Sequence, residues 1–330
     1  MTAPPLTTPA PPAPRTASWL PAFVALAAIW GSSFLFIKIG VRELHPAYVT
    51  LLRCAAGAIT LLVVLLLSRD RLPSDRRLWA RMAVLAFIGN VLPFTLFGYG
   101  EQRVSSIIAG IWNGTTPLMV LLVGLTFLPG ERPTRSRLAG LLLGFVGVLV
   151  VLGAWQGLGG GELIGQLCCA GAAVCYGFAI PYTRRVMARS SSSVISLAAT
   201  QLIVATAELA VIAPLLGGRP PSPSGLSGDV LASVLALGAL GTGLAFWLNY
   251  QIIRVAGPST SASVTYVIPV FATLIGVLAL SEHLHWYEPV GAVVILVGVA
   301  ISQGLLLVRT RAPDKIAGVE AIMPHARPPS

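Results

Sequence analysis

The sequence predicts an all-α polytopic membrane protein, with ten transmembrane helices arranged as two inverted five-helix repeats around a central cavity. The composition is the first reason, because 55% of the residues are hydrophobic and only 10% are charged, against about 25% charged residues in an ordinary soluble domain. The second reason is a series of ten apolar segments. The third is that motifs of the first half recur, in the same order, in the second half.

The apolar segments occupy most of the chain. Each has roughly the 20 mostly apolar residues that a transmembrane helix requires. They lie at residues 19–37, 46–67, 82–100, 105–128, 138–155, 163–182, 193–216, 229–252, 260–281 and 287–308. No soluble catalytic domain fits between them.

Both ends of the chain are predicted to be disordered tails. Residues 1–17 are mainly Pro, Ala and Thr, a composition that cannot bury a core, and residues 309–330 are similar in character. Between these tails we expect the first repeat at 18–156 and the second at 157–308.

The distribution of Lys and Arg predicts the orientation of the chain. With the amino terminus in the cytoplasm, 17 of the 22 Lys and Arg residues lie in cytoplasmic loops and tails, four lie in outer loops, and Arg53 lies inside a span. Because these residues concentrate in cytoplasmic loops, we expect a multi-pass protein of the plasma or inner membrane with both termini cytoplasmic. The net charge of +10 is therefore a topology signal and does not indicate nucleic-acid binding.

Self-comparison of the sequence reveals the internal repeat. The stretch "YGEQRV" at Tyr99–Val104 matches "YQIIRV" at Tyr250–Val255, and "WGSSFLFIK" from Trp30 matches "YGFAIPYTR" from Tyr176. Each copy has five spans, an odd number, so the second copy enters the membrane from the opposite side. Inverted repeats of this kind are typical of secondary transporters, whose substrate site lies near the midplane between the halves.

Five motifs carry a family resemblance. They are "WGSSFLFIKIG" from Trp30, "HPAYVTLLR" from His45, "NGTTPLMVLL" from Asn113, "GERPTRSRLAGLLLGFVGV" from Gly130 and "SEHLHWYEPVGAVVILVGV" from Ser281. Between Trp19 and Val308 the chain resembles two copies of the EamA domain of the drug/metabolite transporter superfamily. The resemblance implies ten helices, a cavity lined mainly by spans 1, 3, 4, 6, 8 and 9, and proton-coupled or facilitated transport of amino acids, their derivatives or other small metabolites.

Six residues are candidates for lining that cavity. Trp30 and Ser33 combine an aromatic ring with a hydroxyl in the middle of the first span, although the small residues around Gly31 also suit close helix packing. Tyr176 is the counterpart of Trp30 in the second copy. The set is completed by Tyr99, Asn113 and Tyr266.

Two prolines predict interruptions in the fourth and ninth spans. Pro117 and Pro269 occupy nearly corresponding positions in the two copies. Proline removes one internal hydrogen bond and kinks a helix, so in lipid the freed carbonyl needs another partner, for which Thr115, Asn113 or a water is suited. The alternatives are a purely structural kink and a pair of broken helices that marks a transport site.

Glu208 and Arg53 lie deep within predicted spans. A charge at the centre of a helix costs about 2.5–3.5 kcal/mol on insertion scales, so such residues are functional candidates. Glu208 is the candidate for proton coupling, with a partnered structural role as its alternative. The expected partners are thus a small-molecule substrate, the lipid bilayer and a proton.

Lys38 and Arg184 end the first and sixth spans at corresponding positions of the repeat. Inversion of the repeat places them at opposite membrane surfaces. They are either interfacial anchors whose long side chains reach the head groups or gates, each of which guards one mouth of the pathway.

A glycine pattern leaves two uses open. Gly140-x-x-x-Gly144, with Gly291 and Gly298, suits either helix packing within one monomer or the face of a homodimer.

Neither a metal nor a cofactor is expected. Cys54, Cys168, Cys169 and Cys175 lie within spans and lack C-x-x-C spacing. His283 and His285 share a short loop with Glu282, but such a loop lacks a preorganised ligand set.

There are three rival functional classes. An ATP-driven pump is disfavoured because the two lysines, Lys38 and Lys315, do not follow a phosphate-binding glycine loop. An intramembrane enzyme would need acids, histidines or cysteines converging at one depth, whereas no histidine lies within a predicted span. A lipid flippase or scramblase is compatible with the same fold. The preferred hypothesis is a secondary transporter of small amphiphilic metabolites and not an enzyme.

Overall fold

The computed structural model describes residues 19–127, 134–151, 161–220, 222–256 and 264–302, and these ranges are helical and contain no strand. Seven described helical stretches are long and apolar enough to cross a membrane. Three of them, Arg76–Glu101, Ser106–Gly124 and Gly228–Asn249, consist of consecutive helices. Two shorter apolar helices, Val264–Leu280 and Tyr287–Ser302, follow. Many large apolar side chains remain exposed on the outer surface, Leu66 and Leu67 among them. The protein is therefore a polytopic membrane protein whose outer surface suits lipid.

The helices follow each other in chain order with short connections. The first half contains α1 (Leu20–Gly40), α2 (Pro46–Leu67), α3 (Arg76–Ala86), the π-helix η1 (Phe87–Val91), α4 (Leu92–Glu101), α5 (Ser106–Gly114), α6 (Thr116–Phe127) and α7 (Arg135–Val151). The second half contains α8 (Gly161–Ala188), α9 (Val194–Gly217), the short 3-10 helix η3 (Pro223–Gly225), α10 (Gly228–Gly238), the π-helix η4 (Ala239–Leu244), α11 (Ala245–Ala256), α13 (Val264–Leu280) and α14 (Tyr287–Ser302).

Polar side chains fix where several of these helices begin. The side chains of Asp75, Ser105 and Ser193 accept hydrogen bonds from the first free backbone N–H groups of α3, α5 and α9. His45 does the same at α2, where its Nδ1 accepts from the N–H of Ala47. Each of these contacts satisfies a donor that the helix itself leaves unpaired.

The two π-helices occupy corresponding places in the repeat. The offset that aligns Tyr99 with Tyr250 maps Phe87–Val91 onto residues that overlap Ala239–Leu244. A π-helix is rare and appears mostly as a single turn inserted in an α-helix, frequently at a functional site. Its occurrence at matching points of both halves is structural support for the repeat.

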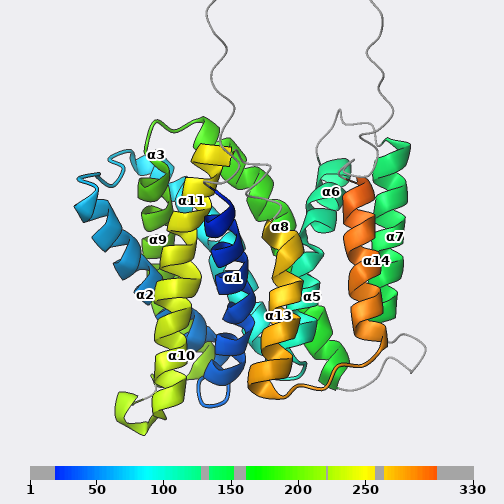
Figure 1. Ribbon diagram of the computed structural model, residues 1–330. Helices are drawn as coiled ribbons and strands as arrows, with labels where there is room; N and C mark the ends of the chain where they lie inside the picture. Colours follow the sequence, from blue (N-terminus) through cyan, green and yellow to red (C-terminus); the bar gives the residue numbers. More distant parts are fainter. Residues whose placement is uncertain (1–18, 128–133, 152–160, 221, 257–263, 303–330) are drawn as a thin grey trace, which may run out of the picture.

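Glycines bring α7 and α14 into backbone contact, and the two helices lie side by side in Figure 1. A Cβ atom built on Gly140 would lie 2.5 Å from the carbonyl oxygen of Gly298, and one on Gly298 would lie 2.6 Å from the backbone nitrogen of Gly144. The glycine pattern is therefore used within the chain.

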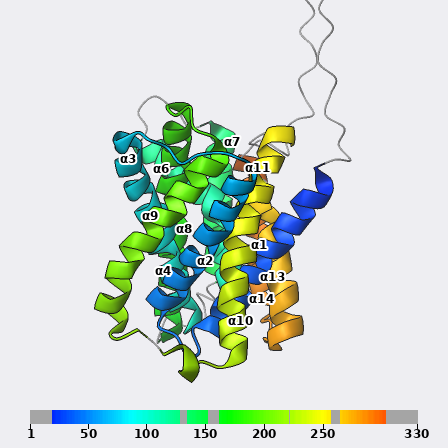
Figure 2. The same ribbon diagram turned by 90° about the vertical axis from the view of Figure 1, so that its left-hand side faces the viewer.

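Helix α13 is held closely by two helices of the first half. It runs beside α1 in both views (Figure 1, Figure 2), and a Cβ on Gly31 of α1 would lie 2.4 Å from that of Phe271. On α5, a Cβ at Gly110 would lie 2.4 Å from the Cβ of Ala272. The small residues of the Trp30 motif thus do serve close packing.

Several connections lie at the same end of the bundle. Those between α1 and α2, α9 and α10, and α13 and α14 all lie at the bottom of Figure 1, whereas the α2–α3 connection lies at the top. Lys38 is in the last turn of α1, so we call the bottom the Lys38 end. The charge distribution predicts that this end faces outward.

The orientation is testable with single cysteines in a background without the four native ones. Ser222 and Ser74 are both exposed, in the α9–α10 and α2–α3 connections respectively. We expect Ser222→Cys to react with an impermeant thiol reagent on intact cells and Ser74→Cys to react only after permeabilisation. The reverse pattern would contradict the predicted orientation.

The glycine contact is testable with a matched pair. A Cβ on Gly147 would lie 2.7 Å from the backbone nitrogen of Ile295, whereas nothing lies within 4 Å of one on Gly124. Overpacking typically costs about 1–3 kcal/mol, so Gly147→Leu should clearly lower the melting temperature in detergent and Gly124→Leu should change it little. Equal melting temperatures would show that α7 and α14 can separate freely.

Candidate functional site

An aromatic cluster lies between the two halves. The ring of Phe97 on α4 lies 5.5 Å from that of Phe34 on α1 and 6.3 Å from that of Tyr176 on α8. Trp30 and Tyr266 are half-buried and pack against the same apolar core. Three of the six predicted cavity residues, Trp30, Tyr176 and Tyr266, are thus brought to one core by α1, α8 and α13.

Arg53 places a buried cation in the neighbourhood of this cluster. Its side chain is 7% exposed, its Nε donates to the hydroxyl of Thr242 on η4 at 2.9 Å, and its guanidinium carbon lies 3.7 Å from the ring centroid of Phe94. Cation–π contact and one hydrogen bond partly compensate the charge. Among the residues that the structure describes, no carboxylate forms an ion pair with Arg53.

The second copy contains a neutral counterpart of Arg53. Helices α2 and α9 begin at Pro46 and Val194, and this spacing aligns Arg53 with Gln201. The Nε2 of Gln201 donates to Oδ1 of Asn90 on η1 at 2.6 Å. Each residue therefore reaches from its own half to the π-helix of the other half, but only one of the two carries a charge.

The other three predicted cavity residues have different surroundings. The hydroxyl of Tyr99 lies 2.9 Å from Nε2 of His45 at the Lys38 end, and the hydroxyl of Ser33 donates to the carbonyl of Ile29 in its own helix. Asn113 is half-buried in the last turn of α5. Burial lowers the pKa of His45, which keeps its ring neutral and its Nδ1 free to accept from Ala47.

The fourth span is interrupted where Pro117 predicts it. Helix α5 ends at Gly114 and α6 begins at Thr116, so Pro117 occupies a first-turn position. The Thr115 hydroxyl donates to the carbonyl of Trp112 at 2.7 Å, which also accepts from the backbone N–H of Thr115; the carbonyl that Pro117 leaves without a helical donor is that of Asn113. By contrast, α13 continues through Pro269, so the predicted interruption of the ninth span is not found. Pro269 is buried and packed against α5, where its Cγ would lie 2.7 Å from a Cβ on Gly114. This packing holds the helical turns on both sides of the proline.

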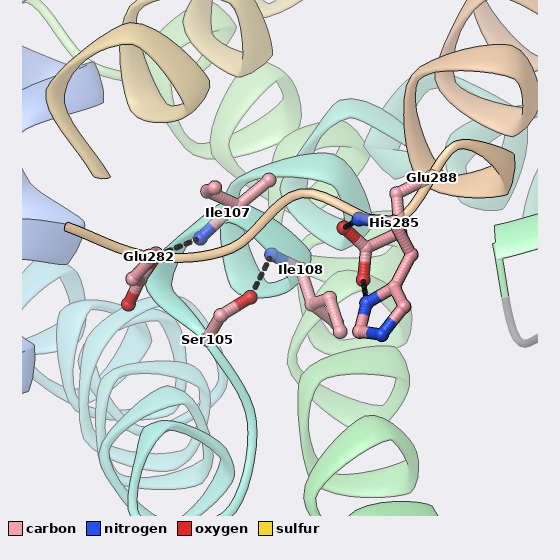
Figure 3. A network of polar contacts seen from close by, with 6 residues as sticks. All are labelled: Ser105, Ile107, Ile108, Glu282, His285 and Glu288. Atoms are coloured by element: carbon pink, nitrogen blue, oxygen red, sulfur yellow. Dashed lines mark hydrogen bonds and ion pairs between the residues drawn. The ribbon is translucent and has the colours of Figure 1, made fainter. Parts of the chain in front are cut away.

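The turn between α4 and α5, residues 102–105, is held by charges from two other elements. The Nζ of Lys38 donates to the carbonyls of Glu101 and Val104 at 2.6 and 2.7 Å. Glu282, in the α13–α14 connection, accepts from the N–H and hydroxyl of Ser106, both at 2.8 Å, and from the N–H of Ile107 at 3.2 Å; Figure 3 shows the Ile107 contact. A cation at a helix C-terminus and an anion at an N-terminus are both favourable.

Lys38 and Arg184 do not share one arrangement. Lys38 is half-buried and bonded to the α4–α5 turn, whereas Arg184 is exposed near the end of α8. The bonds of Lys38 give it a definite partner in place of lipid head groups. Arg184 retains the exposure that an interfacial anchor would have.

Two acids near the Lys38 end matter more than the sequence suggested. Glu282 is the cap just described, and Glu101 is completely buried with both carboxyl oxygens unpartnered among the described residues. The sequence alone does not reveal this burial, because Glu101 lies in the last turn of a span, where an acid is expected to meet water. The alignment of "YGEQRV" with "YQIIRV" contains the signal, since it pairs Glu101 with an isoleucine.

The other acids deep in the described helices and connections have different surroundings. Glu208 on α9 is half-buried, and its Oε2 has no hydrogen-bond partner within the described residues. Glu288 accepts from the backbone N–H of His285 at 3.1 Å and lies 3.4 Å from its Nδ1 (Figure 3). In the described part of the chain, no three His, Cys, Asp or Glu residues are grouped as metal ligands would be.

Comparison with known proteins gives a consistent set of matches. The model of the EamA-like transporter family matches residues 17–153 and again 163–303. The chain is 30% identical to the uncharacterized inner membrane transporter YedA of Escherichia coli K12, over 78% of this chain and 82% of YedA. It is 23% identical to the uncharacterized transporter YoaV of Bacillus subtilis, over 84% of this chain and 93% of YoaV.

A solved crystal structure shares the fold. It has 22% sequence identity and a TM-score of 0.62, over 90% of this chain and 100% of its own. At this level of identity the likeness concerns the arrangement of the helices alone.

The contact of Arg53 with η4 is open to a direct test. Thr242→Val removes the acceptor of the Arg53 hydrogen bond, and losing a bond to a charged group costs about 1.5–3 kcal/mol. We expect a lower melting temperature in detergent. The control is Thr206→Val, because the Thr206 hydroxyl donates only to Leu202 of its own helix; an equal effect of both variants would argue against a special role of Thr242.

Proposed function

The chain belongs to the EamA-like transporter family, and from this premise we propose that it is a secondary transporter that moves small metabolites across the plasma or inner membrane. Transport would proceed by alternating access, through rocking of two inverted five-helix halves around a shared binding region. The names of YedA and YoaV as transporters support this reading.

The observation that carries the proposal is the meeting of both halves at the aromatic cluster. Phe34 and Phe97 come from the first half and Tyr176 from the second. Arg53 lies seven residues into the 22-residue α2, roughly 10 Å along the helix axis, which is well inside a membrane core of about 30 Å. A binding region at this depth, between repeats, is where secondary transporters place their substrate.

The chemistry of the region favours an amphiphilic substrate. Aromatic faces suit an apolar or ring-bearing group, and one arginine suits a single carboxylate or similar anion. Amino acids, their derivatives and comparable metabolites have this character. A carrier of phosphorylated metabolites would be expected to place several cations at this depth.

Two alternative functions are separable from this proposal. A lipid flippase or scramblase would move labelled phospholipids across proteoliposome membranes without any soluble substrate. An intramembrane enzyme would need a convergent catalytic group, whereas the described histidines, His45, His283 and His285, lie in connections.

The proposal is tested first by metabolite profiles of medium and cytosol from cells with and without the protein. The metabolite that changes is then assayed in proteoliposomes. Trp30→Ala and Tyr176→Ala should each lower its transport rate at least several-fold while expression is kept, because each removes aromatic surface from the shared core.

The matched control is Phe145→Ala, which shortens an aromatic side chain on the outer surface of α7 and should leave the rate unchanged. Wild-type rates in both Trp30→Ala and Tyr176→Ala would contradict the assigned binding region. Equal profiles with and without the protein, together with rapid phospholipid movement, would favour the flippase.

A further inference from the structure

Glu101 is a buried acid without a hydrogen bond. Its side chain has no exposed surface, and neither Oε1 nor Oε2 has a partner among the described residues. An ionised carboxylate in such a place is far more costly than a neutral carboxyl, because burial removes its hydration without replacement. The surroundings of the Glu101 side chain therefore suit a neutral carboxyl better than a carboxylate.

Glu282, which bonds to the start of α5 after the same turn, has a carboxyl with the opposite environment. It accepts three hydrogen bonds from Ser106 and Ile107, the environment that stabilises an ionised carboxylate. Two acids that act on one short turn thus have opposite environments. A general shortage of donors at this end of the bundle does not explain the isolation of Glu101.

Packing alone does not require an acid at this position. In the second copy the corresponding residue is Ile252 on α11, which is 1% exposed. The fold accommodates an apolar side chain there, and it would avoid the cost of burying a carboxyl. The acid in the first copy therefore has a use other than filling space.

A cation and a path to water lie beside Glu101. Lys38 bonds to the carbonyl of Glu101 itself and to that of Val104, so its ammonium is close to the carboxyl but is not bonded to it. Both residues line a pocket of about 330 Å³, together with Val41, Arg42 and Gln102. The pocket therefore brings accessible space up to the residue that carries the buried carboxyl.

We propose that Glu101 is the proton-binding site of this carrier, and that its proton decides whether Lys38 holds the α4–α5 turn. The inference rests on the proposed transport function and adds its coupling ion and the gate on which that ion acts. It assigns to Glu101 the role that the sequence suggested for Glu208.

The charged and titratable groups around Glu101 come from five parts of the chain. They are Lys38 in the last turn of α1, Arg42 in the α1–α2 connection, Arg53 on α2, Cys169 on α8 and Glu282 in the α13–α14 connection. Glu282 is already engaged by Ser106, and Arg53 by Thr242 and Phe94. Lys38 is the cation that can change partner with the least movement, since it already touches the backbone of Glu101.

The switch involves one proton and one exchange of partner. When the Glu101 carboxyl loses its proton to water in the pocket, the resulting carboxylate attracts the ammonium of Lys38. The ammonium then leaves the carbonyls that end α4, and the turn is held by Glu282 alone. Reprotonation neutralises Glu101, returns Lys38 to the carbonyls and closes the Lys38 end.

Infrared spectroscopy tests the proton site without any substrate. Purified protein in proteoliposomes is titrated with base, and the C=O stretch of a buried carboxylic acid is followed. We expect a band that disappears as the pH rises, that is absent in Glu101→Gln and that persists in Glu208→Gln. Glu101→Ile, which copies the residue of the second copy, should also lack the band and covers the case in which Glu101→Gln does not insert.

Cysteine labelling tests the gate. Ile108 on α5 is buried beside the turn, so Ile108→Cys, in a background without native cysteines, should be protected while the turn is held. As the pH rises, we expect labelling of Ile108→Cys by an impermeant reagent to increase several-fold more when Glu101 is present than when the same protein also carries Glu101→Gln. Dividing the labelling of one protein by that of the other at each pH cancels the pH dependence of the reagent itself.

A titrating band that survives both Glu101 variants, or that Glu208→Gln removes, would overturn the proton site. A confirmed band with equal labelling in both proteins would overturn the gate. Neither result bears on whether the chain transports metabolites, whereas unchanged metabolite profiles would contradict transport and leave the infrared result in place.

Discussion

Hydrocarbon provides no hydrogen-bond partners, and this constraint determines how the helix ends and interruptions of the chain are arranged. The carbonyls that end α4 are bonded by Lys38 from α1, and the N–H groups that begin α5 are bonded by Glu282 from the second half. At the break after α5, the Thr115 hydroxyl donates a hydrogen bond to the carbonyl of Trp112. Because Lys38 and Glu282 come from distant parts of the chain, satisfying the backbone at the α4–α5 turn also fixes where those parts lie.

The same constraint links the two halves at their π-helices. Arg53 on α2 reaches η4, and Gln201 on α9 reaches η1. Polar contacts thus set the register of the halves, while glycines such as Gly31 set their distance, because a Cβ there would collide with α13.

Sequence reasoning succeeded where the signal is local or periodic. The apolar segments, the repeat and the break at Pro117 follow from composition, self-comparison and the chemistry of proline. It failed where the answer depends on what covers a residue. Helix α13 continues through Pro269, which is buried against α5, and Glu101 is buried although it ends a span. Distance from the end of a hydrophobic segment is a poor guide to burial when another helix covers that end.

Departures from the repeat are the most informative features of the interior. An inverted repeat lets the inward-open and outward-open states be related by exchanging the conformations of the two halves, which makes their energies similar. A charge present in one copy alone makes the two states unequal. In the alignment of the two copies, Arg53 corresponds to Gln201 and Glu101 corresponds to Ile252. A ligand can shift an equilibrium between two states only through different affinities for them, so under the proposed function an anion at Arg53 and a proton at Glu101 would act at positions where the two copies differ in charge.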